Sequence, residues 1–235
     1  ETDLKPFKPE EKVIEYLLAA DDKRKKLVDM TCAEFAEETA SESPAPGGGS
    51  IAAYMGALGA ALGTMVANLS SHKAGWDDRW AMFSDWADKG HALMTELLHL
   101  VDEDTEAFNR IMAVFAMPKS TDEEKAARKA AMQEALKGCT KTPMEMMELI
   151  DETLTLAQSL LGRFNDTSAS DLGVAFLSLK AGIQGAWLNV LINLSSLKDK
   201  AFRDECCQKG EALLAHAVPI AQESYEKVIK VITEK

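Results

Sequence analysis

Residues 43–71 contain no charged side chain, and this feature limits the folds open to the chain more than any other. The segment is long enough to cross a membrane, for which about 20 apolar residues suffice. However, it holds few large aliphatic side chains and six glycines, which are Gly47, Gly48, Gly49, Gly56, Gly59 and Gly63. Small residues let neighbouring helices approach closely, so the segment predicts a helix buried in the middle of a bundle and argues against a membrane span.

A second segment, residues 169–197, is almost as apolar. Between Leu172 and Leu197 its only charged residue is Lys180. A helix that is hydrophobic on every face belongs inside a bundle, so two such helices predict either a thick core or a subunit interface. We therefore expect a homodimer or a higher homo-oligomer.

Helix-start signals recur along the rest of the chain, in the form of capping boxes and of a proline at the first helical position. They are Thr31 with Glu34, Ser120 with Glu123, and Thr142 with Pro143 and Glu145. Together with the helical periodicity, they predict helices near residues 9–20, 23–38, 49–71, 77–116, 121–139, 143–162, 169–197 and 199–233. The expected fold is all-α: a compact multi-helix bundle in one domain, residues 1–235, in which residues 1–20 could be a helix derived from a linker.

The overall charge and the cysteines exclude several classes of function. A net charge of −12 argues against a nucleic-acid partner, because phosphate binding needs a positive surface. The four cysteines form no CxxC pair and no secretory signal precedes them, which predicts a reduced, cytoplasmic protein. Glu96 and His99 form a single E-x-x-H pair, whereas a di-metal helical bundle needs two, so we expect no metal.

The first candidate for ligand contact is the run from Pro46 to Ser50, which contains Gly47, Gly48 and Gly49. Three glycines allow the backbone to lie close to a ligand, and they lead into a helix whose N-terminal N–H groups favour an anion or a carbonyl oxygen. The alternative is a flexible turn with Ser50 as the helix cap.

Asp104 is the one polar residue in a stripe of otherwise apolar residues at helical spacing. The stripe runs along the helix predicted for residues 77–116 and comprises Leu97, Val101, Phe108, Ile111 and Phe115. A carboxylate on an apolar face is desolvated, which raises its pKa toward the range of a general acid. The alternative is a structural salt bridge or a hydrogen bond between helices, and burial alone does not decide between the two.

A polar segment from Asn165 to Asp171 leads into the second apolar helix, so its residues are placed to face the core. Ser168 and Asp171 also have the spacing of a capping box, and Asp171 could act only as a cap. Asn189 and Asn193, four residues apart on the same helix, are typical of hydrogen bonds to neighbouring helices.

Several motifs follow one another in an order that is specific as a set. They are FKPEEKVIEYL at residues 7–17, SPAPGGGSIAA at 43–53, GALGAAL at 56–62, LVDEDTEAF at 100–108, MPK at 117–119, QEAL at 133–136, SDL at 170–172 and NVLINL at 189–194. This set resembles the cyclodeaminase domain of formiminotransferase-cyclodeaminase and its bacterial relatives, which include methenyltetrahydrofolate cyclohydrolases. The resemblance implies a dimeric helical enzyme that binds reduced, often polyglutamylated folate and uses no cofactor beyond this substrate.

The activity implied is closure of 5-formiminotetrahydrofolate to 5,10-methenyltetrahydrofolate with loss of ammonia, a step of histidine degradation and one-carbon metabolism. Asp104 would transfer the proton and Asp171 would stabilise the developing cation, although the two roles could be reversed. Substrate contacts are expected from Pro46, Gly47, Gly48, Gly49, Ser50, Lys73, Arg128 and Asn165. The alternatives are a methenyltetrahydrofolate cyclohydrolase and a non-catalytic folate-binding module. Residues 7–17 resemble the passage out of a transferase part, which favours the cyclodeaminase and an attached or associated formiminotransferase.

Overall fold

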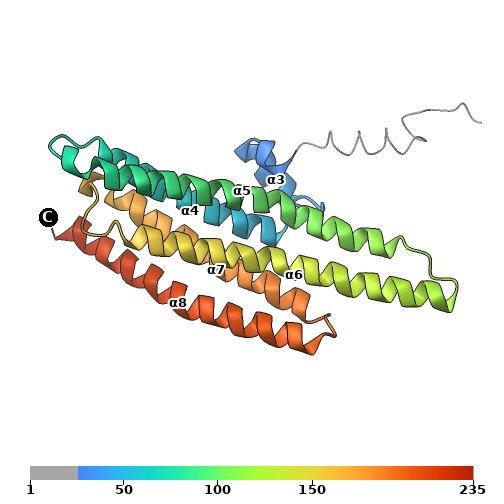
Figure 1. The fold of residues 1–235 in the computed structure, drawn as a ribbon. Coiled ribbons are helices and arrows are strands. Elements are labelled where there is room, and N and C mark those ends of the chain that lie inside the picture. Colours follow the sequence, from blue (N-terminus) through green and yellow to red (C-terminus); the bar gives the residue numbers. More distant parts are fainter. Residues whose placement is uncertain (1–25, 235) are drawn as a thin grey trace, which may run out of the picture.

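All regular secondary structure in residues 26–234, the part described by our computed structural model, is helical (Figure 1). The elements are η1 (Leu27–Asp29), α3 (Cys32–Ala40), α4 (Gly48–Ser71), η2 (Asp77–Arg79), α5 (Trp80–Phe115), α6 (Asp122–Gln158), η3 (Asp166–Ser168), α7 (Ala169–Leu194) and α8 (Lys200–Thr233). The all-α prediction is therefore confirmed for these residues. The helix predicted at 9–20 and the start of the one predicted at 23–38 lie outside the described part.

Two capping boxes start helices as the sequence pattern suggests. Thr31 Oγ1 accepts a hydrogen bond from the Glu34 N–H at 3.2 Å, while the Thr31 N–H donates to the Glu34 carboxylate at 2.7 Å. The second box lies one residue later than predicted, because Thr121 rather than Ser120 is the cap of α6. Its partner is Glu124, whose carboxylate accepts hydrogen bonds from the N–H groups of both Thr121 and Ser120.

The predicted break between helices 121–139 and 143–162 is wrong. Helix α6 continues through Pro143, which lies inside it and is buried. A proline has no N–H to donate to the carbonyl four residues earlier, here that of Cys139. The Asn193 side chain of α7 supplies the missing donor, with its Nδ2 at 2.8 Å from the Cys139 carbonyl oxygen. A hydrogen bond from another helix therefore compensates for the proline, and the helix has no need to end there.

Helices α4 and α7 lie antiparallel in the centre of the bundle, because rising positions on α4 meet falling positions on α7. Gly59 packs against Leu179, and Gly182 faces the backbone of Ala52 and Gly56. Glycines at these contacts allow the two helices to approach closely. Helices α5, α6 and α8 surround this pair, and the α5–α6 connection projects beyond the end of α7 (Figure 1).

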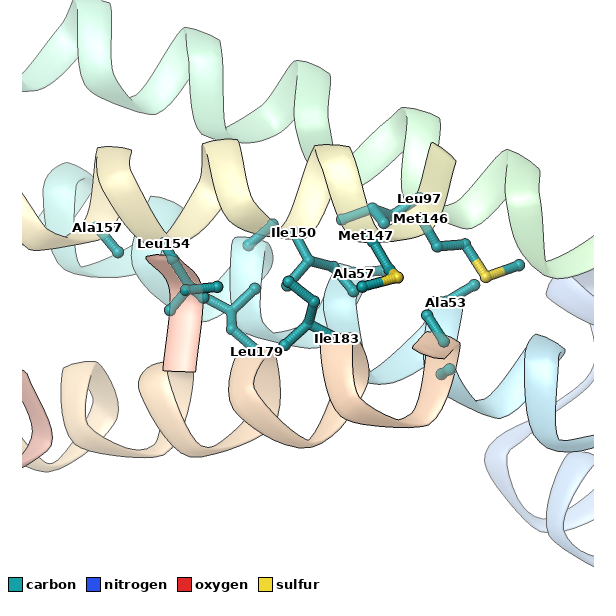
Figure 2. Packing of buried hydrophobic residues seen from close by; sticks show 14 of the residues in the cluster. Ala53, Ala57, Leu97, Met146, Met147, Ile150, Leu154, Ala157, Leu179 and Ile183 are labelled. Atoms are coloured by element: carbon teal, nitrogen blue, oxygen red, sulfur yellow. The ribbon is translucent and has the colours of Figure 1, made fainter. Parts of the chain in front are cut away.

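The core between the helices is continuous. Figure 2 shows Ala57 of α4, Ile150 and Leu154 of α6, and Leu179 and Ile183 of α7 in the layer between these helices. All five side chains are at most 2% exposed.

The prediction that α4 and α7 are buried nearly all round is only half right. Each helix keeps one exposed apolar face, which we call the outer α4–α7 strip. It comprises Leu58, Met65 and Leu69 of α4 and Val174, Leu177, Leu188 and Ile192 of α7. By length and composition alone, Gly48–Ser71 and Asp166–Leu194 could cross a membrane, yet their remaining faces pack inside the bundle.

Candidate active site

Asp104 lies on α5 against the N-terminus of α4. Its carboxylate occupies the space that a side chain at Gly49 would fill, so glycine is needed there for the carboxylate to keep this position. Ser50 Oγ donates a hydrogen bond to Asp104 Oδ2 at 3.1 Å. Asp102, two residues earlier, points elsewhere and accepts a hydrogen bond from the Leu27 N–H at 2.7 Å. The run from Pro46 to Ser50, which we call the glycine loop although α4 begins at Gly48, is therefore in direct contact with Asp104.

Burial raises the pKa of the Asp104 carboxyl above its ordinary value, while hydrogen bonds from the side chain and backbone of Ser50 act in the opposite direction. Among the ion pairs within residues 26–234, none involves Asp104. The salt-bridge alternative therefore has no partner there, whereas the hydrogen bond from Ser50 of α4 to Asp104 of α5 is a bond between helices, as the other alternative expected. Only the hydrogen bonds from Ser50 support the charged form, and they are weaker than the cost of desolvation.

A cleft of about 260 Å³ opens beside this contact. Its walls come from the glycine loop, α5, α6 and α7, and include Pro44, Ala45, Gly47, Gly48, Gly49, Asp104, Thr105, Ala107, Phe108, Ile111, Cys139, Asn189, Ile192 and Asn193. Ligand sites commonly occupy about 300–1,000 Å³, so this volume suits one ring system of a larger molecule. Thr105 Oγ1 is buried there without a hydrogen-bond partner, which leaves a polar group for a ligand to satisfy.

The thiol in the cleft is not a nucleophile. Burial raises the pKa of Cys139 to about 11, although the charge of Arg110 opposes the shift. The protonated thiol donates to the Ala107 carbonyl at 3.0 Å. Since only a thiolate attacks readily, Asp104 remains the group in this cleft that is suited to proton transfer.

The apolar stripe predicted on α5 is buried in its first part and partly exposed in its last part. Leu97 and Val101 are buried, as expected, but Phe108 is 36% and Phe115 is 56% exposed. The last turns of α5 extend past α7, so Phe108 and Phe115 are partly exposed, although Val114 on another face of α5 is buried. Phe108 and Ile111 line the cleft instead, so the stripe that was expected to be core becomes a wall of the site.

Three predicted site residues lie at the other end of the α4–α7 pair. The Asn165 N–H donates to Ser70 Oγ at 2.9 Å, Lys73 Nζ lies 4.0 Å from the centre of the Trp76 ring, and Asp171 is in the first turn of α7. The rise along α4 from Gly49 to Ser70 is about 30 Å. One protomer therefore does not bring Asp171, Lys73 or Asn165 to the Asp104 cleft, because the antiparallel packing places the two motif groups at opposite ends.

Arg128 lies outside the Asp104 cleft. Its Nε donates to the Val114 carbonyl at 3.0 Å and its Nη2 to the Phe115 carbonyl at 3.3 Å, which caps the end of α5. It lines a second cavity near the α5–α6 connection, together with Lys119, Lys125 and Lys129.

Sequence reasoning missed part of the cleft wall. Asn193 makes the predicted bond between helices, to Cys139, but it also lines the cleft, as does Asn189. Their spacing of four on an apolar helix was a usable signal for a shared face. Thr105 gave no signal beyond its place next to Asp104. Within residues 26–234, no three His, Cys, Asp or Glu side chains are grouped so that they could hold a metal ion.

Comparison with known proteins decides the family. The sequence profile described as formiminotransferase-cyclodeaminase matches residues 31–212, which include the glycine loop, Asp104 and all of α4 to α7. The chain belongs to the cyclodeaminase-domain family of formiminotransferase-cyclodeaminase. This family of cyclodeaminases and cyclohydrolases acts on folate.

Relatives of the cyclodeaminase-domain family differ in length and in name. The chain is 40% identical to a methenyltetrahydrofolate cyclohydrolase of Methylorubrum extorquens, over 84% of this chain and 95% of that protein. It is 35% identical to the formimidoyltransferase-cyclodeaminase of Rattus norvegicus over 91% of this chain, a match that spans only 40% of the rat protein. The crystal structure of formiminotetrahydrofolate cyclodeaminase from Thermotoga maritima superposes with a TM-score of 0.76 at 27% identity, over 86% of this chain and 98% of that one.

Replacing Gly49 by alanine tests whether the close contact with Asp104 is required. The added methyl group meets the carboxylate, so we expect the side chain to be displaced and turnover of folate to fall about tenfold to a hundredfold. Gly138→Ala on α6 is the control, because its Cβ would meet no atom within 4 Å and the residue does not line the cleft. Equal kinetic constants for the two variants would show that the contact has no role.

Proposed function

We propose that the protein is a formimidoyltetrahydrofolate cyclodeaminase, which converts 5-formiminotetrahydrofolate to 5,10-methenyltetrahydrofolate and ammonia. The observation that carries this proposal is the desolvated Asp104 carboxyl, held by Ser50 at the edge of the cleft. The reaction needs one group that can both accept and return a proton near neutral pH, and a carboxyl with a raised pKa suits that task.

The chemistry requires few protein groups. Folate N10 attacks the carbon of the protonated formimino group on N5, which forms a tetrahedral intermediate with an exocyclic amino group and a proton on N10. The Asp104 carboxylate takes that proton and returns it to the exocyclic amino group, after which the carbon–nitrogen bond breaks and ammonia leaves. The carboxylate is then ionised beside the new methenyl cation, whose charge it stabilises. Because both reacting nitrogens belong to one molecule, orientation in the cleft supplies much of the rate.

The second candidate is hydrolysis of 5,10-methenyltetrahydrofolate. It is favoured by the match with the Methylorubrum extorquens cyclohydrolase, which spans 95% of that protein. The same cleft would serve, with water attacking the methenyl carbon and Asp104 accepting a proton from it. A cytoplasmic location, the lack of a further cofactor and an attached or associated formiminotransferase stay predictions.

Turnover of two folates separates the candidates. We expect purified protein to release ammonia from 5-formiminotetrahydrofolate, with methenyltetrahydrofolate appearing at the same rate. Turnover of the methenyl compound alone would identify a cyclohydrolase, and folate binding without turnover of either compound would identify a binding module.

Asp104→Asn separates a catalytic role from a structural one. Loss of a proton-transfer group lowers kcat by about 10²–10⁴-fold. The same variant should be more stable than the wild type at neutral pH, because the folded-state pKa of Asp104 is raised. The stabilisation by protonated Asp104 is fully present below the unfolded pKa and is lost as pH rises through the folded pKa. At neutral pH the Asn variant should therefore have the higher thermal midpoint, and unchanged kcat would remove Asp104 from the mechanism.

We further propose a homodimer formed through the outer α4–α7 strip. This strip runs from Ile192, in the wall of the Asp104 cleft, to Leu69 and Val174 near Asp171. A twofold axis perpendicular to the helices and near their middle would place opposite ends of the two copies together. Asp171 and Lys73 of the second copy would then lie beside Asp104 of the first. An axis parallel to the helices would keep the two groups apart.

Mixing of inactive subunits distinguishes these arrangements. In dimers formed by coexpressing Asp104→Asn and Asp171→Asn chains, one of the two sites would hold both aspartates. We expect about a quarter of the wild-type activity from random mixing, against near-background activity for either variant alone. Absence of recovery in a verified mixed dimer would contradict the shared site.

A further inference from the structure

Asn189 and Asn193 place two amide groups in the wall of the Asp104 cleft, one turn apart on α7. Asn189 Nδ2 donates a hydrogen bond to the Gly185 carbonyl at 2.9 Å. Asn193 Nδ2 donates to the Cys139 carbonyl at 2.8 Å. A carbonyl oxygen can only accept, so the donating end of each amide has to face it. Both amides are therefore held in one orientation by their NH2 groups.

The oxygen atoms of these two amides are not used by the surrounding protein. Among the hydrogen bonds within residues 26–234, none ends at Oδ1 of Asn189 or Asn193. Both side chains are half-buried and line the cleft. An oriented acceptor without a partner at a ligand cleft is suited to a group that donates an N–H or an O–H. The cleft thus offers two such acceptors in addition to the Asp104 carboxyl.

The amide of Asn189 lies close to the group that transfers the proton. A Cβ added at Gly48 would be 3.6 Å from Asn189 Oδ1, whereas a Cβ added at Gly49 would meet the Asp104 carboxylate. The amide and the carboxyl therefore lie against successive residues at the start of α4. A small group bound there is in a position to exchange a proton with Asp104 and to donate a hydrogen bond to Asn189.

The spacing of the two amides suits a nitrogen that donates two hydrogen bonds. The Cβ atoms of residues four apart on a helix are separated by about 5–6 Å. A tetrahedral nitrogen that donates two hydrogen bonds of ordinary length holds its acceptors roughly 5 Å apart. In the proposed ring closure, the exocyclic nitrogen carries two hydrogens in the bound substrate and three once it is protonated to leave. Hydrolysis of the methenyl compound would instead place a hydroxyl on that carbon, with a single hydrogen.

We infer that Asn189 and Asn193 accept hydrogen bonds from the exocyclic nitrogen of the substrate and thereby select a nitrogen leaving group over oxygen. This inference rests on the proposed ring closure at Asp104. The leaving nitrogen gains a hydrogen and a positive charge when Asp104 returns the proton, so the two acceptors stabilise that step more than the bound substrate. Asn189 is the specificity-determining residue that can be tested alone, because Asn193 also joins α7 to α6.

Binding of two closely similar folates tests the inference without turnover. 5-Formyltetrahydrofolate has an oxygen where 5-formiminotetrahydrofolate has its exocyclic nitrogen, so it offers no N–H group there. Both compounds are titrated by calorimetry into Asp104→Ala, which lacks the proton-transfer group and adds no amide of its own. We expect the formimino compound to bind about tenfold more tightly, the value of one hydrogen bond to a charged group. Asn189→Leu in the same background should remove this preference, whereas Asn189→Asp, which keeps an acceptor oxygen, should retain it.

Kinetics with Asp104 in place give an independent measurement. Asn189→Leu should lower kcat for release of ammonia from the formimino compound about tenfold, because the lost hydrogen bond is strongest when the nitrogen leaves. The inhibition constant of 5-formyltetrahydrofolate should stay unchanged. The control is Asn109→Leu, the same substitution on α5 at a residue that does not line the cleft, and it should change neither quantity.

Two results would overturn the inference. One is equal binding of the two folates by Asp104→Ala. The other is an equal loss of affinity for both folates in Asn189→Leu, which would assign this side chain to the pterin that the two compounds share. If the preference depends on Asn189 but the wild type releases no ammonia, the proposed activity fails and the site for the nitrogen stands.

Discussion

The structure of the site depends on one contact, that of the Asp104 carboxylate with the backbone at Gly49 and Ser50. A side chain at position 49 would collide with the carboxylate, so glycine there is what allows α5 to bring an acid to the start of α4. The hydrogen bonds from Ser50 orient the group without neutralising its desolvation. The acid is therefore held in one place, and its pKa is raised above the ordinary value. Both properties follow from packing a polar side chain against a helix end in a mostly apolar wall.

The far wall of the cleft depends on a second polar contact between helices. Pro143 leaves the Cys139 carbonyl without its helical donor, and Asn193 fills that place from α7. The bond joins α6 to α7 beside the cleft, and both residues that form it line the cavity. Asn193 thus serves the fold and the site at once. A buried polar group paired in this way specifies how the two helices meet, which apolar packing alone would leave less defined.

The all-α fold and the position of Asp104 could be predicted from the sequence. Helix caps, glycine patterns and an aspartate within an apolar stripe are all signals that lie close together in the chain. The prediction failed where the answer depended on how helices pair. The break at Pro143 was wrong because its compensation comes from α7, far along the chain. The antiparallel packing of α4 and α7 separates Asp171 from Asp104, and no local pattern shows this. Phe108 and Phe115 have the spacing of core residues, yet the ends of α5 and α6 extend past α7, where no third layer covers them (Figure 1).

Burial at the start of α4 raises the pKa of the Asp104 carboxyl above that of an ordinary aspartate. A direct measurement is the titration of that carboxyl by carbon NMR of protein labelled at aspartate, with its signal assigned by comparison with Asp104→Asn. We expect a pKa above the ordinary value, and a further rise when Ser50 is replaced by alanine, because the hydrogen bonds that oppose the shift are weakened. A carboxyl that titrates at or below the value of an exposed aspartate would contradict it.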